Sequence, residues 1–216
     1  LENKYTKPLE NFGILYFNDK ESLYKGFSGG DILNKDVKAK DSTSSIKFIK
    51  SDTLLLYKNI KNKKMVTSVM LFVKKKIVED TLDLFEWKLT GETTRILDYD
   101  CNIATTFFRG RNYKAYFYKN KKYRNGPWKM SGLPGLILKF EVTDSDCVYS
   151  VEATKVVLNS KEKYAIVNPF KDEKTMTFDE FKKKNQEKVD ALRSFYAQQG
   201  DEVIFTNGSL EKILNE

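Results

Sequence analysis

Histidine is absent from this sequence of 216 residues, and cysteine and proline are scarce. Without an imidazole there is no Ser-His-Asp triad, no Cys-His pair and no metal site that depends on histidine. The two cysteines do not form a CxxC pair, so we expect neither a structural zinc site nor a thioredoxin-like centre. The sequence therefore predicts no metal ion, and it contains no motif that would call for a cofactor.

Long apolar runs are missing as well. No stretch of 18 apolar residues occurs, so we expect no transmembrane segment. The hydrophobic fraction of 40% is nevertheless enough for a folded core, which excludes global disorder. The sequence begins at Leu1 without an initiator methionine, as a chain does after loss of a signal peptide or after trimming, and both explanations stay open.

Short runs rich in β-branched and aromatic residues dominate the pattern. The clearest case is the segment 136–142, in which Leu, Leu, Phe and Val alternate with Ile, Lys and Glu. Strands are predicted at 12–17, 46–49, 53–57, 65–73, 82–89, 94–103, 113–118, 136–142 and 147–153. Arg109-Gly110-Arg111 is read as a tight turn, and the last two strands as an antiparallel hairpin.

One long helix is predicted near the C-terminus. Thr177 and Glu180 have the spacing of a capping box, and apolar residues follow at helical intervals up to residue 198. The helix should pack through Phe178, Phe181, Val189 and Leu192. The predicted fold is therefore a single domain, 1–216, that is mainly β (α+β), with antiparallel strands curling into an open barrel or bowl and one long C-terminal helix.

Candidate chemical groups are few. Asp98 and Asp100, and likewise Asp144 and Asp146, are paired carboxylates, but the residues that would complete a calcium loop are missing, so solvated strand and turn positions are favoured. Lysine clusters occur at 61–64, 74–76, 119–124 and 182–184, and the formal charge is +8. Because they are scattered among acidic residues without any RNP, KH or helix-turn-helix signature, nucleic-acid binding is disfavoured.

The cysteines lie on the apolar faces of two predicted strands. Cys101 and Cys147 could both be inert buried thiols, and in an oxidising compartment they could form a disulfide if their Cα atoms lie within roughly 7 Å. Both alternatives stay open.

The most informative segment runs from Gly126 to Leu138. Leu133-Pro134-Gly135-Leu136 has the pattern of a type II turn, which would place Gly135 at positive φ, and Gly126-Pro127 is a second chain reversal. Trp128 and Met130 can anchor the intervening loop in apolar surface. We favour a structural connection into the strand 136–142, with Trp128 and Leu133 against the core, over a ligand-binding loop.

This segment resembles the signature of the GLPGLI family, whose name spells the string Gly132, Leu133, Pro134, Gly135, Leu136 and Ile137. The surrounding residues fit as well: Gly126, Pro127 and Trp128 before the string, and Cys101, Arg109, Gly110 and Arg111 upstream. The resemblance implies an exported protein of Bacteroidota, periplasmic or secreted, and it supplies no catalytic residue. The family pattern contains a match to Cys101 and no partner at Cys147.

Three functions follow from these observations. The favoured one is an exported, non-catalytic binding or accessory protein that holds an apolar ligand or a peptide in the concavity of the sheet, because no catalytic constellation is found and the aromatic residues suit contact surfaces. The second is a carboxylate-based hydrolase, or an accessory domain, acting on glycans. The third is a binder of nucleic acid or anionic surfaces through the basic patches.

Overall fold

The fold is known from a computed structural model that describes residues 12–27, 54–72, 74–144, 147–161, 164–199 and 210–213. Its strands are β1 (Phe12–Phe17), β2 (Glu21–Phe27), β3 (Leu54–Asn59), β4 (Lys64–Leu71), β5 (Lys74–Thr81), β6 (Lys88–Ile96), β7 (Tyr99–Phe108), β8 (Arg111–Tyr118), β9 (Leu136–Asp144), β10 (Cys147–Glu152) and β11 (Thr175–Thr177). They are followed by the helix α2 (Phe178–Ala197). The prediction of a mainly β protein with one long C-terminal helix is confirmed.

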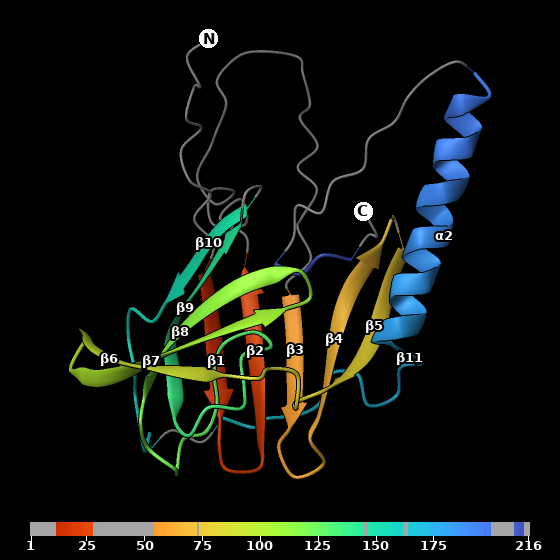
Figure 1. Ribbon diagram of the computed structural model, residues 1–216. Helices are drawn as coiled ribbons and strands as arrows, with labels where there is room; N and C mark the ends of the chain where they lie inside the picture. Colours follow the sequence, from red (N-terminus) through yellow and green to blue (C-terminus); the bar gives the residue numbers. More distant parts are fainter. Residues whose placement is uncertain are drawn as a thin grey trace, which may run out of the picture.

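The strands form two open sheets, which we call sheet A and sheet B. Sheet A has the order β1-β2-β3-β4-β5-β11, and sheet B the order β10-β9-β8-β7-β6. All neighbouring strands are antiparallel except β11, which pairs with β5 in parallel. In Figure 1 the strands of sheet A stand side by side, and β6 and β7 cross in front of them at a steep angle, which is one of the two common ways for sheets to pack.

The hairpin between β7 and β8 turns at the predicted position. Arg109 and Gly110 both have positive φ, 44° and 75°, which is the conformation of a two-residue type I′ turn. Phe108 then pairs with Arg111, and the ladder continues to Cys101 opposite Tyr118. This turn fixes which residues of the two strands share a face, because successive side chains alternate between the faces.

Four parts of the predicted strand pattern differ from the structure. Strand β2 is not among the strands predicted from the residue pattern. Residues 82–87 do not form a strand, and β6 begins only at Lys88. Strand β5 is not predicted because three of its residues form the lysine cluster 74–76, and β11 is not predicted because it has only three residues. The predicted strand 46–49 lies outside the described residues.

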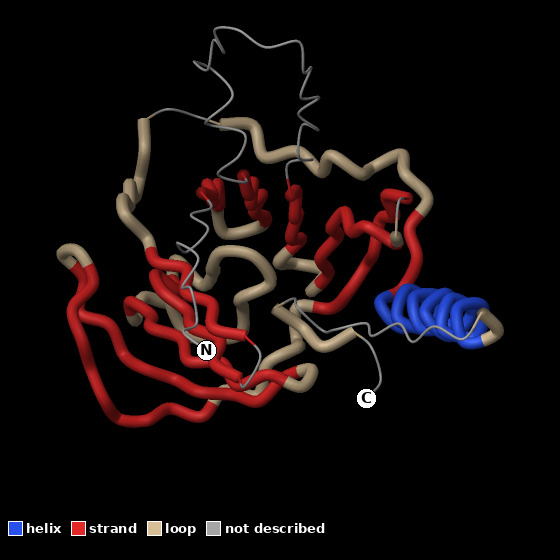
Figure 2. Tube along the Cα trace, turned by 90° about the horizontal axis from the view of Figure 1, so that it is seen from above, coloured by secondary structure: helices blue, strands red, loops and turns tan. Residues whose placement is uncertain are grey.

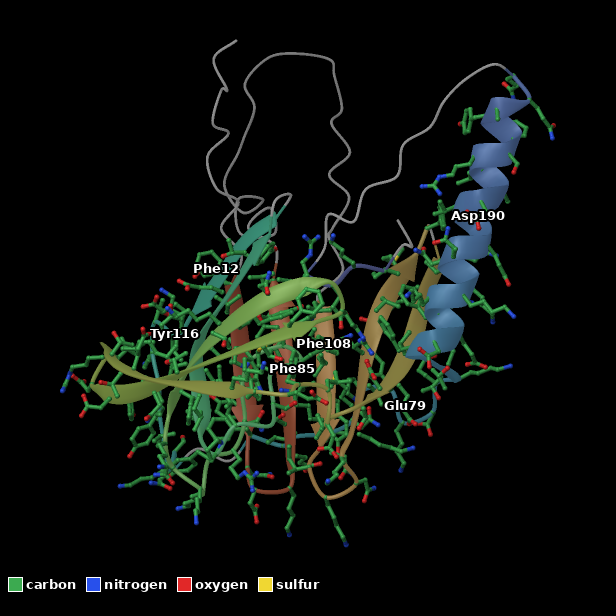
Figure 3. The ribbon with its side chains drawn as sticks, in the orientation of Figure 1. Phe12, Glu79, Phe85, Phe108, Tyr116 and Asp190 are labelled. Atoms are coloured by element: carbon green, nitrogen blue, oxygen red, sulfur yellow. The ribbon has the colours of Figure 1, made fainter. Side chains whose placement is uncertain are left out.

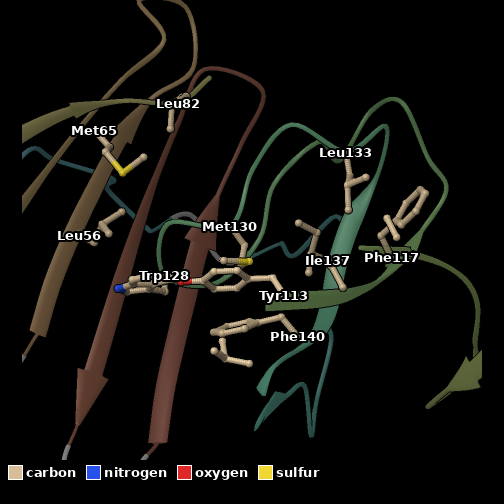
Figure 4. Close-up of a cluster of buried hydrophobic side chains, with 13 residues drawn as sticks. Leu56, Met65, Leu82, Tyr113, Phe117, Trp128, Met130, Leu133, Ile137 and Phe140 are labelled. Atoms are coloured by element: carbon tan, nitrogen blue, oxygen red, sulfur yellow. The ribbon is translucent and has the colours of Figure 1, made fainter. Parts of the chain in front are cut away.

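The main core lies between the two sheets. It joins Leu56 and Met65 of sheet A to Tyr113 and Phe140 of sheet B. Figure 4 shows the rings of Trp128, Tyr113 and Phe140 close together, and the ring centroids of Trp128 lie 6.5 Å from Tyr113 and 6.1 Å from Phe140. One core thus contains side chains of both sheets.

The helix α2 begins as predicted and covers the end of sheet A next to β11. Thr177 accepts a hydrogen bond from the Glu180 amide, and the Glu180 side chain accepts one from the Thr177 amide, so the capping box is complete. Phe178, Phe181 and Val189 are buried. Figure 1 shows the second half of the helix projecting past the ends of β4 and β5. Of the described helical residues, none form a segment long and apolar enough to cross a membrane.

The other face of sheet A, turned away from sheet B, is crossed by the chain that leads from β10 to β11. Figure 2 shows residues 164–174 running along this side. Phe170 packs there against Val66 and Ile77, and the ring of Tyr164 lies 4.8 Å from that of Tyr16. Both faces of sheet A are therefore partly covered. The outer face of sheet B is covered by residues 153–158 around Cys101 and Leu136 and stays open near the β7–β8 turn, where Phe107 is exposed.

Candidate functional site

The signature loop connects β8 to β9 and lies between the two sheets. Trp128, Met130 and Leu133 are buried in the main core. The indole Nε1 of Trp87 donates a hydrogen bond of 2.8 Å to the carbonyl oxygen of Ser131. This is the packing that the structural interpretation of the loop predicts, with Trp128 and Leu133 against the core.

A buried lysine holds the loop from the side of sheet A. Lys58 of β3 is fully buried, and its Nζ donates to the carbonyl oxygens of Gly126 and Met130, at 2.8 and 2.7 Å, and more weakly to Oδ1 of Asn125 at 3.5 Å. Ser22, opposite Lys58 in the sheet, donates to the same Asn125 oxygen. Burial lowers the pKa of Lys58 to about 7. The lysine thus acts as a clamp on the loop backbone.

The glycines of the loop have different roles from those predicted. Gly132, not Gly135, has positive φ, 89°, so the predicted type II turn with its left-handed residue at Gly135 is wrong. Gly135 is required by close approach: a Cβ atom there would lie 2.0 Å from the carbonyl oxygen of Tyr118. At Gly126 a Cβ would lie 3.0 Å from side-chain atoms of Met130 and Ile137. Of the two glycines in the string, Gly132 is therefore required by its positive φ and Gly135 by the close approach of the Tyr118 backbone.

An ion network ties this loop to distant parts of the chain. Arg109 lies 2.9 Å from the Asp80 carboxylate and 2.6 Å from that of Glu211. Lys129 lies 2.6 Å from Glu211 and 3.7 Å from Asp80. All four side chains are at most 17% exposed, and the guanidinium Cζ of Arg109 stands 3.3 Å from the ring centroid of Phe178. Arg111, the other basic residue of the turn motif, is fully buried at the start of β8.

The space between the sheets does not offer the concavity that the favoured function assigns to a ligand. Trp128, Met130, Phe140 and Phe117 fill it and are at most 9% exposed. Figure 3 shows Phe85 and Phe108 in the same interior, and their ring centroids are 4.6 Å apart. The part of this space that the described residues line is therefore filled by side chains.

The cysteines are not brought together. Cys101 is a free, buried thiol on β7, and burial raises its pKa to about 11. Cys147 begins β10, and β8 and β9 lie between the two strands. Three strand spacings amount to about 14 Å, twice the Cα separation of roughly 7 Å that a disulfide tolerates. The bridge left open by the sequence is therefore not formed.

The carboxylate pairs do not gather into a site either. Asp98 lies in the turn between β6 and β7, Asp100 lies on β7, and both side chains are highly exposed beside Arg95. The solvated interpretation of this pair is confirmed. The side chains of Asp144 and Asp146 lie outside the description. Among the described residues, no group of three His, Cys, Asp or Glu side chains is placed to hold a metal ion.

The lysine clusters lie on separate elements. Cluster 61–64 falls in the turn between β3 and β4, where Lys63 pairs with Asp83 and Lys64 with Glu79. Cluster 74–76 opens β5, cluster 119–124 follows β8, and cluster 182–184 lies on α2. They do not form one continuous basic strip along a single element.

A groove of about 480 Å³ opens on the face of sheet B that points away from sheet A. Its floor follows from the strand register: Lys88, Thr105, Lys114 and Glu141 lie opposite one another on β6, β7, β8 and β9. Phe107 stands in the next row and is 69% exposed. The remaining members of this face that line the groove are Glu86, Asn112 and Thr143.

Glu141 in the groove is paired with neighbouring side chains of the same face. Tyr116 donates a hydrogen bond of 2.7 Å to Glu141, and Lys139 lies 3.1 Å from both Glu141 and Glu152. Partial burial alone would raise the pKa of Glu141, but the hydrogen bonds from Tyr116 and Lys139 outweigh it and lower the pKa. Glu141 is therefore an ionised hydrogen-bond acceptor near neutral pH, poorly suited to donate a proton as a general acid.

None of these groove residues is singled out by the sequence motifs. One signal could have found them: Phe107 and Phe108 are adjacent in a strand, so one of the two rings must point to the outer face. Phe108 joins the core and Phe107 stays exposed. The exposed ring of Phe107 beside hydrogen-bonding side chains offers an apolar face on which a ligand can stack.

Comparison with known proteins gives a fold relationship. No family model and no curated protein matches the chain. Two solved structures of PNGF-II, in a C2 and a P21 crystal form, match with TM-scores of 0.51 and 0.52 and a sequence identity of 20%. The matches cover 82% and 83% of this chain and 30% and 31% of the PNGF-II chain. At this identity the likeness concerns the fold alone, and the chain spans less than a third of the length of these neighbours.

Proposed function

We propose that this chain is an exported, non-catalytic binding or accessory module of the GLPGLI family, periplasmic or secreted, and that the groove on sheet B is its ligand surface. The family assignment rests on the string from Gly132 to Ile137 and its flanking residues, and the export on what that resemblance implies. The single observation that carries the binding function is the exposed Phe107 above a row of hydrogen-bonding side chains.

An oligosaccharide is the ligand that suits this surface. The flat ring of Phe107 offers an apolar face on which the C–H face of a sugar ring can stack. Around it, Lys88 and Lys114 donate hydrogen bonds, Glu86 and Glu141 accept them, and threonine hydroxyls do both. The two lysines and two glutamates balance, which favours a neutral, hydroxyl-rich ligand over a polyanion.

The binding function is tested with neutral oligosaccharides, first as an immobilised panel and then by isothermal titration of the best binder. Phe107→Ala should weaken binding at least tenfold and leave the melting temperature unchanged, because the ring is exposed. Leu89→Ala is the matched control, since Leu89 is 65% exposed on β6 but does not line the groove. No binding by the wild-type chain, or equal binding by Phe107→Ala, would contradict the proposal.

The carboxylate-hydrolase alternative uses the same groove, because Glu86 and Glu141 both line it. A glycosidase needs one carboxyl group whose pKa is raised so that it can protonate the leaving group. The lowered pKa of Glu141 argues against that role. Release of a reducing end from the bound oligosaccharide, lost in Glu141→Gln, would reverse this judgement.

The third alternative predicts a different response to salt. Binding of nucleic acid through basic patches would weaken steeply as the salt concentration rises, because counterions are released from the phosphates. The affinity for a neutral oligosaccharide should change little between about 50 and 200 mM salt. Over the same range, a protein that binds nucleic acid through several phosphate contacts loses affinity steeply. One titration series in salt therefore separates the two.

A further inference from the structure

The C-terminal segment 210–213 lies on the folded sheets in the manner of a bound peptide. The amide of Lys212 donates a hydrogen bond of 3.0 Å to the carbonyl oxygen of Arg109, and the hydroxyl of Tyr113 donates to the carbonyl oxygen of Leu210. Leu210 packs against the main core, and Ile213 packs against the cluster that contains Phe178. The segment is thus held by its backbone at two points and by apolar side chains at both ends.

Between these two anchors, Glu211 enters a buried cationic site. Its carboxylate lies 2.6 Å from both Arg109 and Lys129. The same two cations share Asp80, and both stand over the ring of Phe178, with Lys129 Nζ at 4.8 Å from the centroid. Without Glu211, two nearly buried cations would share one carboxylate, and an uncompensated buried charge is costly. The site therefore requires a carboxylate from the segment that occupies it.

The groups that form this site belong to elements that are also held in place by contacts outside the segment. Arg109 lies in the type I′ turn between β7 and β8, Tyr113 lies within β8, and Lys129 belongs to the loop that Lys58 clamps. A site that is formed before its ligand arrives does not lose ordering entropy on binding.

We infer that this junction is a peptide-binding site for segments of the form apolar–acidic–lysine–apolar, occupied in this chain by its own residues 210–213, with the side chain of Lys212 over Gly110. A partner segment of the same chemistry occupies it by displacing the tail. This site shares Tyr113 with the groove on sheet B, but its ion-pairing residues lie outside the groove and the inference does not depend on the proposed function.

The probe is a fluorescein-labelled peptide of residues 207–216, compared with the same peptide in which Glu211 is replaced by glutamine. Glu211→Ala in the full chain should weaken docking of its own tail, so the probe should bind this variant at least tenfold more tightly than wild type. The glutamine peptide should bind the variant at least tenfold more weakly than the glutamate peptide. Glu187→Ala, at an exposed glutamate of α2, is the matched control and should behave as wild type.

A second measurement keeps the inference testable should Glu211→Ala fail to fold. Excess probe added to the wild-type chain should accelerate hydrogen exchange of the Lys212 amide, because displacement of the tail breaks its bond to Arg109. Equal binding of both peptides to the variant would overturn the inference. So would the absence of binding combined with unchanged exchange at Lys212.

Discussion

Replacing Lys58 by methionine should abolish a specific pH dependence of stability. Methionine keeps most of the volume of the side chain but carries no charge. Burial lowers the pKa of Lys58 from 10.5 to about 7 in the folded chain. Between these values the unfolded chain binds about one proton more than the folded chain, so the free energy of unfolding rises with pH. From pH 7 to pH 9 the expected increase is about 2 kcal/mol, from 1.36 kcal/mol per pKa unit.

The direction and the window of this effect are specific to a buried base. Below about pH 7 the lysine is protonated in both states, so its contribution no longer changes with pH. The measurement should stop at pH 9, because the pKa values of Tyr57 and Tyr116 are raised to about 12. Above pH 10 those two tyrosines would release protons more readily in the unfolded chain, and stability would fall again.

Urea unfolding at pH 7, 8 and 9 measures the effect directly. The wild-type midpoint should move to higher urea with each step. That of Lys58→Met should not rise and should fall slightly near pH 9, because the raised pKa of the buried Cys101 thiol lets the unfolded chain release that proton first. Lys121→Met, at an exposed lysine, should retain the wild-type slope. A flat wild-type profile would refute the reasoning, as would a Lys58→Met profile as steep as that of the wild type. Lys58→Met also leaves the carbonyl oxygens of Gly126 and Met130 without their donor, so its absolute stability is less informative than its slope.

Three further predictions concern stability and thiols. Gly135→Ala should lower the free energy of unfolding by about 2 kcal/mol or more through overpacking, and lower the melting temperature. Gly91→Ala, at a glycine with positive φ but open space around it, should cost only about 1 kcal/mol. Equal melting temperatures of the two variants would contradict this. Titration of denatured, unreduced protein should find two free thiols at Cys101 and Cys147, and a count of zero would restore the disulfide. Thr177→Ala should lower stability by about 1 kcal/mol through loss of the helix cap, and an unchanged melting temperature would show that the cap contributes nothing.

The elements that the sequence predicts well are those with a local signal. The helix α2 is bounded by a capping box and carries apolar residues at helical spacing, so its range is predicted to within one residue at its end. The turn at Arg109 and Gly110 contains a glycine, the residue type that tolerates positive φ. The strand 136–142 alternates clearly, and β9 covers it. In each case the neighbouring residues alone determine the conformation.

The features that the sequence misses depend on contacts between distant segments. Lys58 follows a run of leucines and ends up fully buried, because residues 125–130 supply carbonyl oxygens for its ammonium group. Gly135 looks like a turn glycine, but its constraint is the backbone of Tyr118 on the neighbouring strand. The ion network joins four segments, and its acidic partners lie in β5 and the C-terminal tail. Hydrophobic periodicity and secondary-structure propensity carry no information about such contacts between distant segments.

The signature string and the ligand surface therefore occupy different parts of this protein. Leu133, Leu136 and Ile137 are buried, and a Cβ atom at Gly135 would collide with the backbone of Tyr118, so the string is committed to packing between the two sheets. The groove contains none of these residues. Since outer-face side chains such as that of Phe107 contribute little to the core, they can change without loss of the fold. Two chains that share the string would then be expected to share this architecture, while the identity of the ligand would follow the residues of the outer face.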